Sequence, residues 1–440
     1  MTEKTRSSRF GSILCLVAAL YFFGVVAYAL VNSAEFANGT ARLIRYILAP
    51  GAIGLALALC AAFLSNEARL TVGLSAVSLL AALFAFEAYL TIKIIPGRLG
   101  LVGFVGDEVS VEEYKENLPP GRTMKHVNDA LDTQLLESAY LAPMPGDKML
   151  LCSVLGEPVT YTPDRLGFRN PPSVYENDVS VMLLGDSFSE GFCLREGEHL
   201  AAKLRQGMPD LLNTGHRGIG PLYQLAILGR YGPEFQPDLT LFSFFAGNDW
   251  RNLERELEKP WLSAALDPAV DFGPIEHPDQ SELTAPVISG WWAETTLSWG
   301  DYLRAQRVFR NFLALQKTAE ILGIHYPKAT DENPVFADVL IRAKQITSQW
   351  DGEIVIVYVP TVSRYMGLVA QPFIHDPLRV LVKDAAAQAG LDVIDLTDVI
   401  EMQEDPASYY APDSHFNEAG AELAARAITE GLRQRNLIEQ

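Results

Sequence analysis

Three long apolar runs occupy the first hundred residues of the chain, at 11–31, 46–64 and 71–92. Each run is long enough to cross a bilayer, because about 20 helical residues span the hydrocarbon layer. A buried helix of a soluble protein can also be apolar, but three successive runs of this length favour membrane spans. Residues 1–100 are therefore predicted to form a transmembrane anchor of three helices.

From about residue 178 to the C-terminus, short β-branched or apolar runs alternate with helical periodicity. The predicted strands are 179–185, 211–213, 239–247, 353–361 and 392–397, and the predicted helices are 198–206, 222–231, 334–350, 377–389 and 417–432. This alternation is typical of the α/β class, here a three-layer α/β/α sandwich, flavodoxin-like, with a mostly parallel sheet. The domain is predicted to cover residues 178–440.

Two segments depart from this alternation. Residues 101–177 form a lead-in with weak strand patterns at 148–155 and 158–162, which are expected to add edge structure to the main domain. Residues 250–332 are rich in Pro, Trp and acidic side chains and are too long for a simple connection. They are predicted to form either an inserted lid or cap or a structural excursion over the sheet edge.

Basic residues near the first apolar run set the expected topology. Lys4, Arg6 and Arg9 precede that run, so the positive-inside rule places the N-terminus in the cytoplasm. Three spans then export the remainder, to the periplasmic side of a bacterial plasma membrane. Four later basic residues count against this orientation: Arg42, Arg45, Lys93 and Arg98. If the first span were instead a cleaved signal peptide, two spans would still leave the soluble part outside.

One carboxylate interrupts the third apolar run. Glu87 lies in LFAFEAYL, where an ionisable side chain is costly and is by default a candidate functional group. Because it lies near the outer end of the span, reaching toward the interface or pairing with Lys93 is at least as good an interpretation as a role in transport.

Charge and cysteine usage exclude some functions. The formal net charge of -19 opposes nucleic-acid binding, which requires clustered Lys and Arg. Cys15 and Cys60 fall in apolar runs, whereas Cys152 and Cys193 lie in the soluble part without metal-like spacing. Zinc is not expected. Cys152 and Cys193 could pair in an oxidising compartment, but two unpaired thiols are the default expectation.

Four segments with chemically useful side chains lie at or near the ends of the predicted strands or before the last helix: GDSFSEG, NTGHRGIG, AGND and APDSHFN. Parallel α/β sheets bind ligands at the carboxyl ends of their strands. In this order the segments resemble the blocks of the SGNH hydrolase family of GDSL-like esterases and lipases, over residues 158–434. The lead-in YTPDRLGFRNP is similar to the N-x-x-GFR run that often precedes the first block in bacterial members.

The resemblance implies that Ser187 is the nucleophile, His415 the base and Asp413 the residue that orients the base. The residues support this interpretation, since Ser187 follows a strand in a tight turn and a serine hydroxyl needs a base. The family more often has Asp-x-x-His, whereas one residue fewer separates Asp413 from His415. Residues two apart face the same side only in an extended segment. Pro412 and a helix start at Asn417 favour such a segment.

Acyl transfer also requires donors for the developing oxyanion. The candidates are the N–H of Ser187, the N–H of Gly218 and the side chain of Asn248. Gly218 and Asn248 can each be explained as turn residues. Their occurrence together with the Ser and Asp/His segments, in the order of the family's blocks, favours an enzyme.

The remaining histidines are interpreted more simply. His126, His277, His325 and His375 are expected in loops or on the surface, His199 at the start of a helix, and His216 near the pocket without serving as the base.

The first hypothesis for function is a membrane-anchored serine esterase that acts through an acyl-serine intermediate and needs no metal or cofactor. The substrate would be an ester-bearing lipid or glycan. An alternative is an O-acyltransferase, or acetyltransferase, of an envelope polysaccharide, which would need a membrane partner to supply the acyl donor. A third hypothesis is an inactive SGNH domain that binds glycan or lipid.

Overall fold

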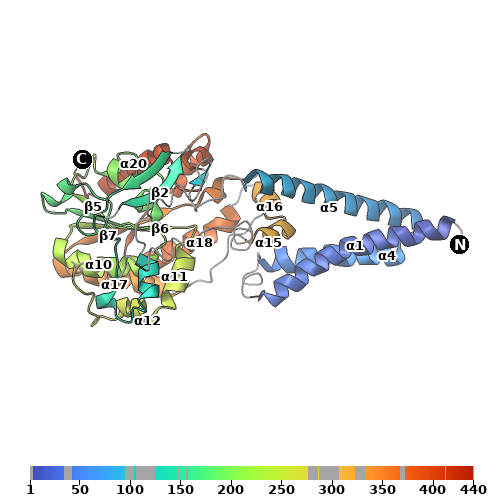
Figure 1. Cartoon of the computed structure of the whole chain (residues 1–440), viewed down its shortest axis with the longest axis horizontal. Coiled ribbons are helices and arrows are strands. Elements are labelled where there is room, and N and C mark those ends of the chain that lie inside the picture. The colour runs from blue at the N-terminus through green and yellow to red at the C-terminus, as the bar shows by residue number, and fades with distance from the viewer. Residues whose placement is uncertain are drawn as a thin grey trace. The chain divides into compact units, whose positions relative to one another are not determined.

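The computed structural model describes residues 3–33, 42–94, 104–105, 124–146, 148–154, 157–275, 286, 307–322, 333–366, 372–411 and 413–439. The chain divides into two compact units (Figure 1). The helical unit comprises Met1–Pro96, Trp299–Asp331 and Met366–Ile374, and the α/β unit comprises Gly97–Ser298, Glu332–Tyr365 and His375–Gln440.

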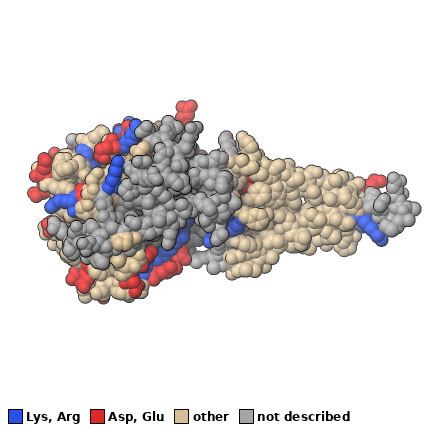
Figure 2. Space-filling model, viewed as in Figure 1, with Lys and Arg blue, Asp and Glu red and all other residues tan. Residues whose placement is uncertain are grey.

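The N-terminal part of the helical unit contains the predicted apolar helices, as α1 (Glu3–Val31), η1 (Leu43–Leu48) with α4 (Ala49–Phe63), and α5 (Asn66–Ile94). Three stretches are long and apolar enough to cross a membrane: Arg9–Val31, Leu43–Phe63 and Asn66–Ile92. Figure 2 shows no charged side chain along the visible face of these helices between their two ends. The prediction of three apolar N-terminal helices is confirmed.

Glycines allow α1 and α5 to approach closely. A Cβ atom on Gly73 would lie 2.9 Å from the Gly11 carbonyl oxygen, and one on Gly11 would lie 2.7 Å from the Leu70 nitrogen. Small residues favour this kind of backbone contact between apolar helices. At the same end, the Arg69 guanidinium donates to the Leu64 carbonyl at 2.7 Å, which satisfies a group that the end of α4 leaves open.

The core of the α/β unit is a parallel sheet in the order β5 (Leu211–Asn213), β4 (Val181–Leu184), β6 (Leu239–Phe245), β7 (Glu353–Val359) and β8 (Asp392–Asp395). All five predicted strands are present, within a few residues of their expected bounds. The prediction of a mostly parallel α/β sheet is confirmed.

Alternate residues of each strand face opposite sides of the sheet, so one hydrophobic strand serves two cores. Met182 and Phe242 pack in a core that includes residues of α10 (Pro221–Phe235), α17 (Val335–Thr347) and α18 (Pro372–Ala389). Leu183 and Leu241 pack in a second core with α9 (Leu200–Leu204) and α20 (Glu418–Gln434). Figure 1 shows α20 on one side of the sheet and α10 and α17 on the other, which gives the three layers.

Short elements complete the described part of the unit: α7 (Met124–Ala130), η2 (Leu136–Ser138), η3 (Pro172–Tyr175), η5 (Ser348–Trp350), η6 (Val362–Tyr365), α19 (Thr397–Glu401) and η7 (Pro406–Tyr409).

The lead-in forms its own small sheet, in which β2 (Met149–Val154) pairs with β1 (Phe104–Val105) and β3 (Glu157–Tyr161). The predicted strands are present, but they do not extend the edge of the main sheet. Cys152 of β2 is disulfide-bonded to Cys193, with Cα atoms 5.4 Å apart. The expectation of two unpaired thiols is wrong, because β2 folds back onto a segment 41 residues away in sequence.

The inserted segment 250–332 separates into two described parts. The first, with α11 (Asp249–Leu257), α12 (Pro260–Ser263) and η4 (Ala264–Leu266), buries Trp250 and Leu262 in the core beneath the sheet. The second, α15 (Val308–Leu313) and α16 (Gln316–Leu322), belongs to the helical unit. Residues 276–285, 287–306 and 323–332 lie outside the described residues, and a lid or cap stays a prediction.

Candidate active site

Ser187 is presented by a sharp turn from β4 into α8 (Ser187–Glu190). Gly185 makes the turn with φ +156°, and a Cβ there would overlap the Ser189 hydroxyl, so no side chain fits. Asp186 caps α8, because its Oδ1 accepts a hydrogen bond from the Phe188 N–H at 3.0 Å. The Ser187 side chain therefore projects from the first turn of a helix at the carboxyl end of a central strand.

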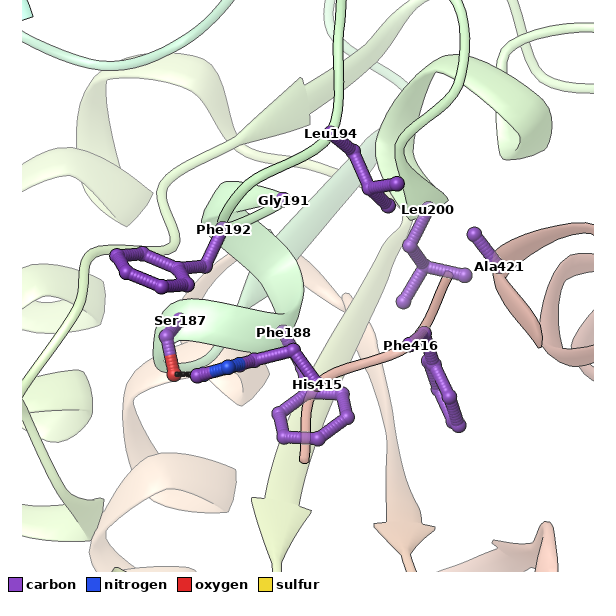
Figure 3. A pocket seen from close by; sticks show the side chains of 9 residues that line it. All are labelled: Ser187, Phe188, Gly191, Phe192, Leu194, Leu200, His415, Phe416 and Ala421. Carbon is purple, nitrogen blue, oxygen red and sulfur yellow. Dashed lines mark hydrogen bonds between the residues drawn. The ribbon is translucent and has the colours of Figure 1, made fainter. Parts of the chain in front are cut away.

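His415 lies within hydrogen-bonding distance of this serine. Its Nε2 is 2.8 Å from the Ser187 Oγ (Figure 3). The imidazole packs between the rings of Phe188 and Phe192, with centroid distances of 5.1 Å and 4.6 Å. Both aromatic rings come from the segment that carries the serine, so the same local structure positions both members of the pair.

Asp413 lies beside the other ring nitrogen of the base, Nδ1. Its Oδ2 lies 3.4 Å from the His415 Nδ1, an ion-pair separation without the alignment of a hydrogen bond. Its Oδ1 accepts the His415 N–H at 3.1 Å. Burial acts to raise the pKa of Asp413, but the neighbouring His415 outweighs burial and lowers that pKa. Asp413 therefore stays ionised beside the imidazole.

The short Asp-x-His spacing is accommodated by a turn. Ser414 between the two residues has φ +78°, in the left-handed region, and its N–H bonds to the Ala411 carbonyl at 2.9 Å. The expectation of an extended segment is wrong, because a left-handed residue turns Asp413 back toward the ring that follows it. Pro412 lies outside the described residues, and Asn417 caps α20 as predicted, by accepting the Gly420 N–H at 3.0 Å.

We expect Asp413→Ala to lower kcat for an ester substrate by roughly 10²- to 10⁴-fold, since loss of the orienting carboxylate has effects of this size in serine hydrolases. The measurement is steady-state hydrolysis of a short-chain aryl ester by the full chain. Asp405→Ala, outside the 410–416 loop, serves as the matched control and should leave kcat unchanged. A normal kcat for Asp413→Ala would remove Asp413 from the mechanism.

The other two predicted oxyanion donors have geometry suited to a turn. Gly218 has φ +78°, and no atom lies within 4 Å of a Cβ built there. The Asn248 side chain contacts the buried Asp186, and its Oδ1 has no hydrogen-bond partner among the described residues. Burial raises the pKa of Asp186, whereas its contact with Asn248 opposes that shift. Asn248 thus lies beside the residue that precedes Ser187, and its oxyanion role remains a prediction, as does that of Gly218.

A narrow crevice lies beside the serine and the histidine. Its walls are almost entirely apolar (Figure 3): Ser187, Phe188, Gly191, Phe192, Leu194, Leu200, His415, Phe416 and Ala421. Gly218 and Asn248 are not among these residues. Within the described part of the chain, no cluster of three or more metal-ligating side chains occurs.

A buried ion pair behind the serine was not predicted. Glu190, at the end of α8, is fully buried, and Arg217 donates to its two carboxylate oxygens at 2.9 Å and 2.8 Å. Tyr161 donates its hydroxyl to the same carboxylate at 2.9 Å. Burial tends to raise the pKa of Glu190, but Arg217 and His216 hold that pKa far below its usual range. The pair joins α8 to the segment before Gly218. The sequence signal available for this ion pair was that the segments GDSFSEG and NTGHRGIG carry side chains of opposite charge.

The lead-in motif GFRNP supports the same region. Arg169 is buried and donates to the carbonyls of Gly191 and Leu194, both at 2.9 Å. These carbonyls follow the end of α8, where the helix leaves acceptors without partners. Asn170 in turn accepts the Asn213 N–H at 2.8 Å. The motif therefore supports the loop that follows α8 and the end of β5.

The remaining histidines take structural positions. His199 caps α9 and His216 is buried 3.6 Å from Glu190. His375 is only 4% exposed, so the expectation of a surface or loop position is wrong for this residue, which α18 turns inward. The side chains of His126, His277 and His325 lie outside the described residues.

Comparisons with known proteins gave one family match and several matches to solved structures. Residues 372–440 match a family model described as "SGNH hydrolase-like domain, acetyltransferase AlgX". No curated protein matches the chain in sequence. Among solved structures, TesA is 14% identical over 58% of this chain and 98% of its own, with a TM-score of 0.32. A G-D-S-L family lipolytic protein from Veillonella parvula is 12% identical over 58% and 98%, with a TM-score of 0.31. A lipase/acylhydrolase from Enterococcus faecalis is 14% identical over 58% and 96%, also with a TM-score of 0.31.

Proposed function

We propose that this chain is a membrane-anchored acyl-transfer enzyme of the SGNH hydrolase type with Ser187 as its nucleophile, supported by the match of residues 372–440 to an SGNH hydrolase-like family model. The observation that supports this most directly is the 2.8 Å contact between the Ser187 hydroxyl and the His415 Nε2. Such a contact lets the imidazole take the hydroxyl proton as the oxygen attacks.

The proposed first half-reaction forms an acyl-enzyme. The Ser187 Oγ attacks an ester carbonyl while His415 accepts its proton, and the N–H of Ser187, the N–H of Gly218 and the Asn248 amide stabilise the oxyanion. His415 then gives the proton to the leaving alcohol as the carbon–oxygen bond breaks. The acyl group remains on Ser187, and Asp413 stabilises the transient imidazolium charge.

The second half-reaction has two candidate acceptors. If water attacks the acyl-serine, the protein is an esterase. If a sugar hydroxyl attacks, it is an O-acyltransferase, and the match of residues 372–440 to a model named for an acetyltransferase favours this acceptor. In both cases His415 deprotonates the attacking oxygen, so the Ser–His pair supports the two equally.

Incubation of the full chain in nanodiscs with a short-chain aryl ester, with and without an oligosaccharide, tests both steps. We expect an acyl adduct on Ser187 by intact mass, and acyl-sugar formation at the expense of free acid. Free acid alone, unaffected by the oligosaccharide, would favour the esterase. The absence of any adduct or turnover from folded protein would favour a domain that only binds lipid or glycan.

We propose that the α/β unit lies on the extracytoplasmic side. The basic residues before α1 support this orientation, and so does the Cys152–Cys193 disulfide, because such bonds persist mainly in oxidising compartments. A phosphatase reporter that is active only outside the cytoplasm, fused after residue 100, should be active. Activity of a cytoplasm-specific reporter at that position would overturn the assignment.

A further inference from the structure

The carboxylate in the third apolar helix has three hydrogen bonds. Glu87 on α5 is fully buried and accepts from the Lys317 N–H at 2.8 Å, the Thr318 N–H at 2.7 Å and the Thr318 hydroxyl at 2.8 Å. These donors belong to the first turn of α16, whose N–H groups have no partner within the helix. Glu87 therefore fastens α16 to α5; the side chain of Lys93, its expected partner, lies outside the described residues.

The preceding helix, α15, contacts the apolar helices at two further points. The Tyr21 hydroxyl of α1 donates to the Leu313 carbonyl at 2.9 Å. The rings of Phe84 on α5 and Phe312 on α15 are 5.4 Å apart between centroids. Figure 1 shows α15 and α16 beside α5 within the helical unit. We call α15 and α16 together, residues 308–322, the hairpin.

With the Arg69 end of α5 at one boundary of the hydrocarbon layer, these contacts would lie inside the layer, near its opposite boundary. Arg69 marks the polar end of α5, because its guanidinium binds carbonyls at the α4–α5 turn. Phe84 lies about 22 Å further along the helix, at roughly 1.5 Å per residue. Since the hydrocarbon layer is about 30 Å thick, the Phe84–Phe312 contact would lie ~8 Å inside its far boundary. That is the depth at which interfacial helices bury their apolar side chains.

The hairpin exposes large apolar side chains at this depth. The exposed fractions are 74% for Phe309, 42% for Leu313, 39% for Ile321 and 36% for Leu322. Phe86 and Tyr89 on the neighbouring stretch of α5 are also exposed, at 42% and 59%. The hairpin thus exposes apolar side chains next to a helix that is long and apolar enough to cross a membrane, and the Phe84–Phe312 contact joins the two.

We propose that the hairpin is a membrane-interface element. Its apolar side chains Phe309, Leu313, Ile321 and Leu322 bury among lipid acyl chains of the outer leaflet, and Glu87 holds the hairpin against α5. The chain enters the hairpin after β6 and returns through α17 to β7. The hairpin therefore adds a connection between the α/β unit and the membrane to the one that follows α5.

Site-specific quenching tests the lipid contact. In a Cys15→Ala, Cys60→Ala background, Phe309→Cys is labelled with the fluorophore NBD, and the full chain is placed in nanodiscs. We expect spin-labelled phosphatidylcholine to quench the label at least twofold and iodide in the buffer to have little effect. Leu59→Cys, an exposed position on α4, is the matched control inside the membrane. Quenching by iodide but not by lipid would overturn the proposal, and protection from both would mean that protein covers the face, which overturns it as well.

The role of Glu87 in holding the hairpin against α5 is tested in the same background with Glu87→Ala. Loss of the three hydrogen bonds should release the hairpin and lower lipid quenching at position 309 at least twofold. Quenching at position 59 should not change, which shows that the spans still pack. Unchanged quenching at position 309 would show that Glu87 does not hold the hairpin in place. Neither measurement depends on catalysis, so this inference and the proposed enzyme activity can fail separately.

Discussion

Ser187→Ala is expected to abolish covalent labelling by a fluorophosphonate and to lower ester turnover by at least ~10³-fold, as removal of the nucleophile does in serine hydrolases. The physical reason is that, among the described residues, the Ser187 hydroxyl is the one within hydrogen-bonding distance of the His415 Nε2. Without Ser187 the imidazole has no oxygen to activate. Labelling is read from a fluorescent gel and turnover from aryl alcohol release.

Ser189→Ala is the matched control. Ser189 lies in the same short helix and is also buried, but its hydroxyl is directed to the Leu184 carbonyl at 3.4 Å. We expect this variant to keep both labelling and turnover. If Ser187→Ala labelled as strongly as the wild type, the nucleophile would lie elsewhere. If the folded wild type failed to label, the domain would not be a serine enzyme.

Glu190→Ala is expected to lower the stability of the α/β unit by about 3–5 kcal/mol, because it leaves the Arg217 charge buried without its partner. For a unit of this size the melting temperature should fall by roughly 10 °C. Near-UV circular dichroism of the full chain during heating is the measurement. Since Arg217 precedes Gly218, the surviving folded protein should also lose turnover.

Glu196→Ala serves as the control for this ion pair. Glu196 lies 3.6 Å from Arg169, but its side chain is 68% exposed, so its loss should cost less than about 1 kcal/mol. Equal effects of the two substitutions would contradict a special contribution from burial.

Acidity offers a second check on Glu190, with Glu190→Gln. The folded-state pKa of Glu190 is lowered, so its contribution to stability is complete above the ordinary glutamate pKa of about 4.3 and is lost as the pH falls below it. The difference in melting temperature between wild type and Glu190→Gln should therefore shrink between pH 6 and pH 3.5. A constant difference would mean that ionisation of Glu190 does not stabilise the fold.

The sequence alone determined the features that depend on local pattern. Apolar runs of membrane-spanning length predicted the three N-terminal helices, and alternating strand and helix patterns predicted all five strands of the parallel sheet. Asn417 was recognisable as a helix cap from its place before an amphipathic run. Each of these signals arises from neighbours along the chain, since repeat period, run length and capping are short-range properties.

Only the tertiary structure decided which distant residues meet. Ser187 and His415 are 228 positions apart in sequence. They come within 2.8 Å because the turn after β4 and the loop before α20 lie next to each other in the fold. The left-handed Ser414, the Cys152–Cys193 bond and the Glu190–Arg217 pair likewise depend on how separate segments pack. Glu87 is the clearest case: its partners lie some 230 residues later, in a segment without a readable pattern. Such contacts are set by packing across the fold, and no repeat or spacing along the chain encodes them.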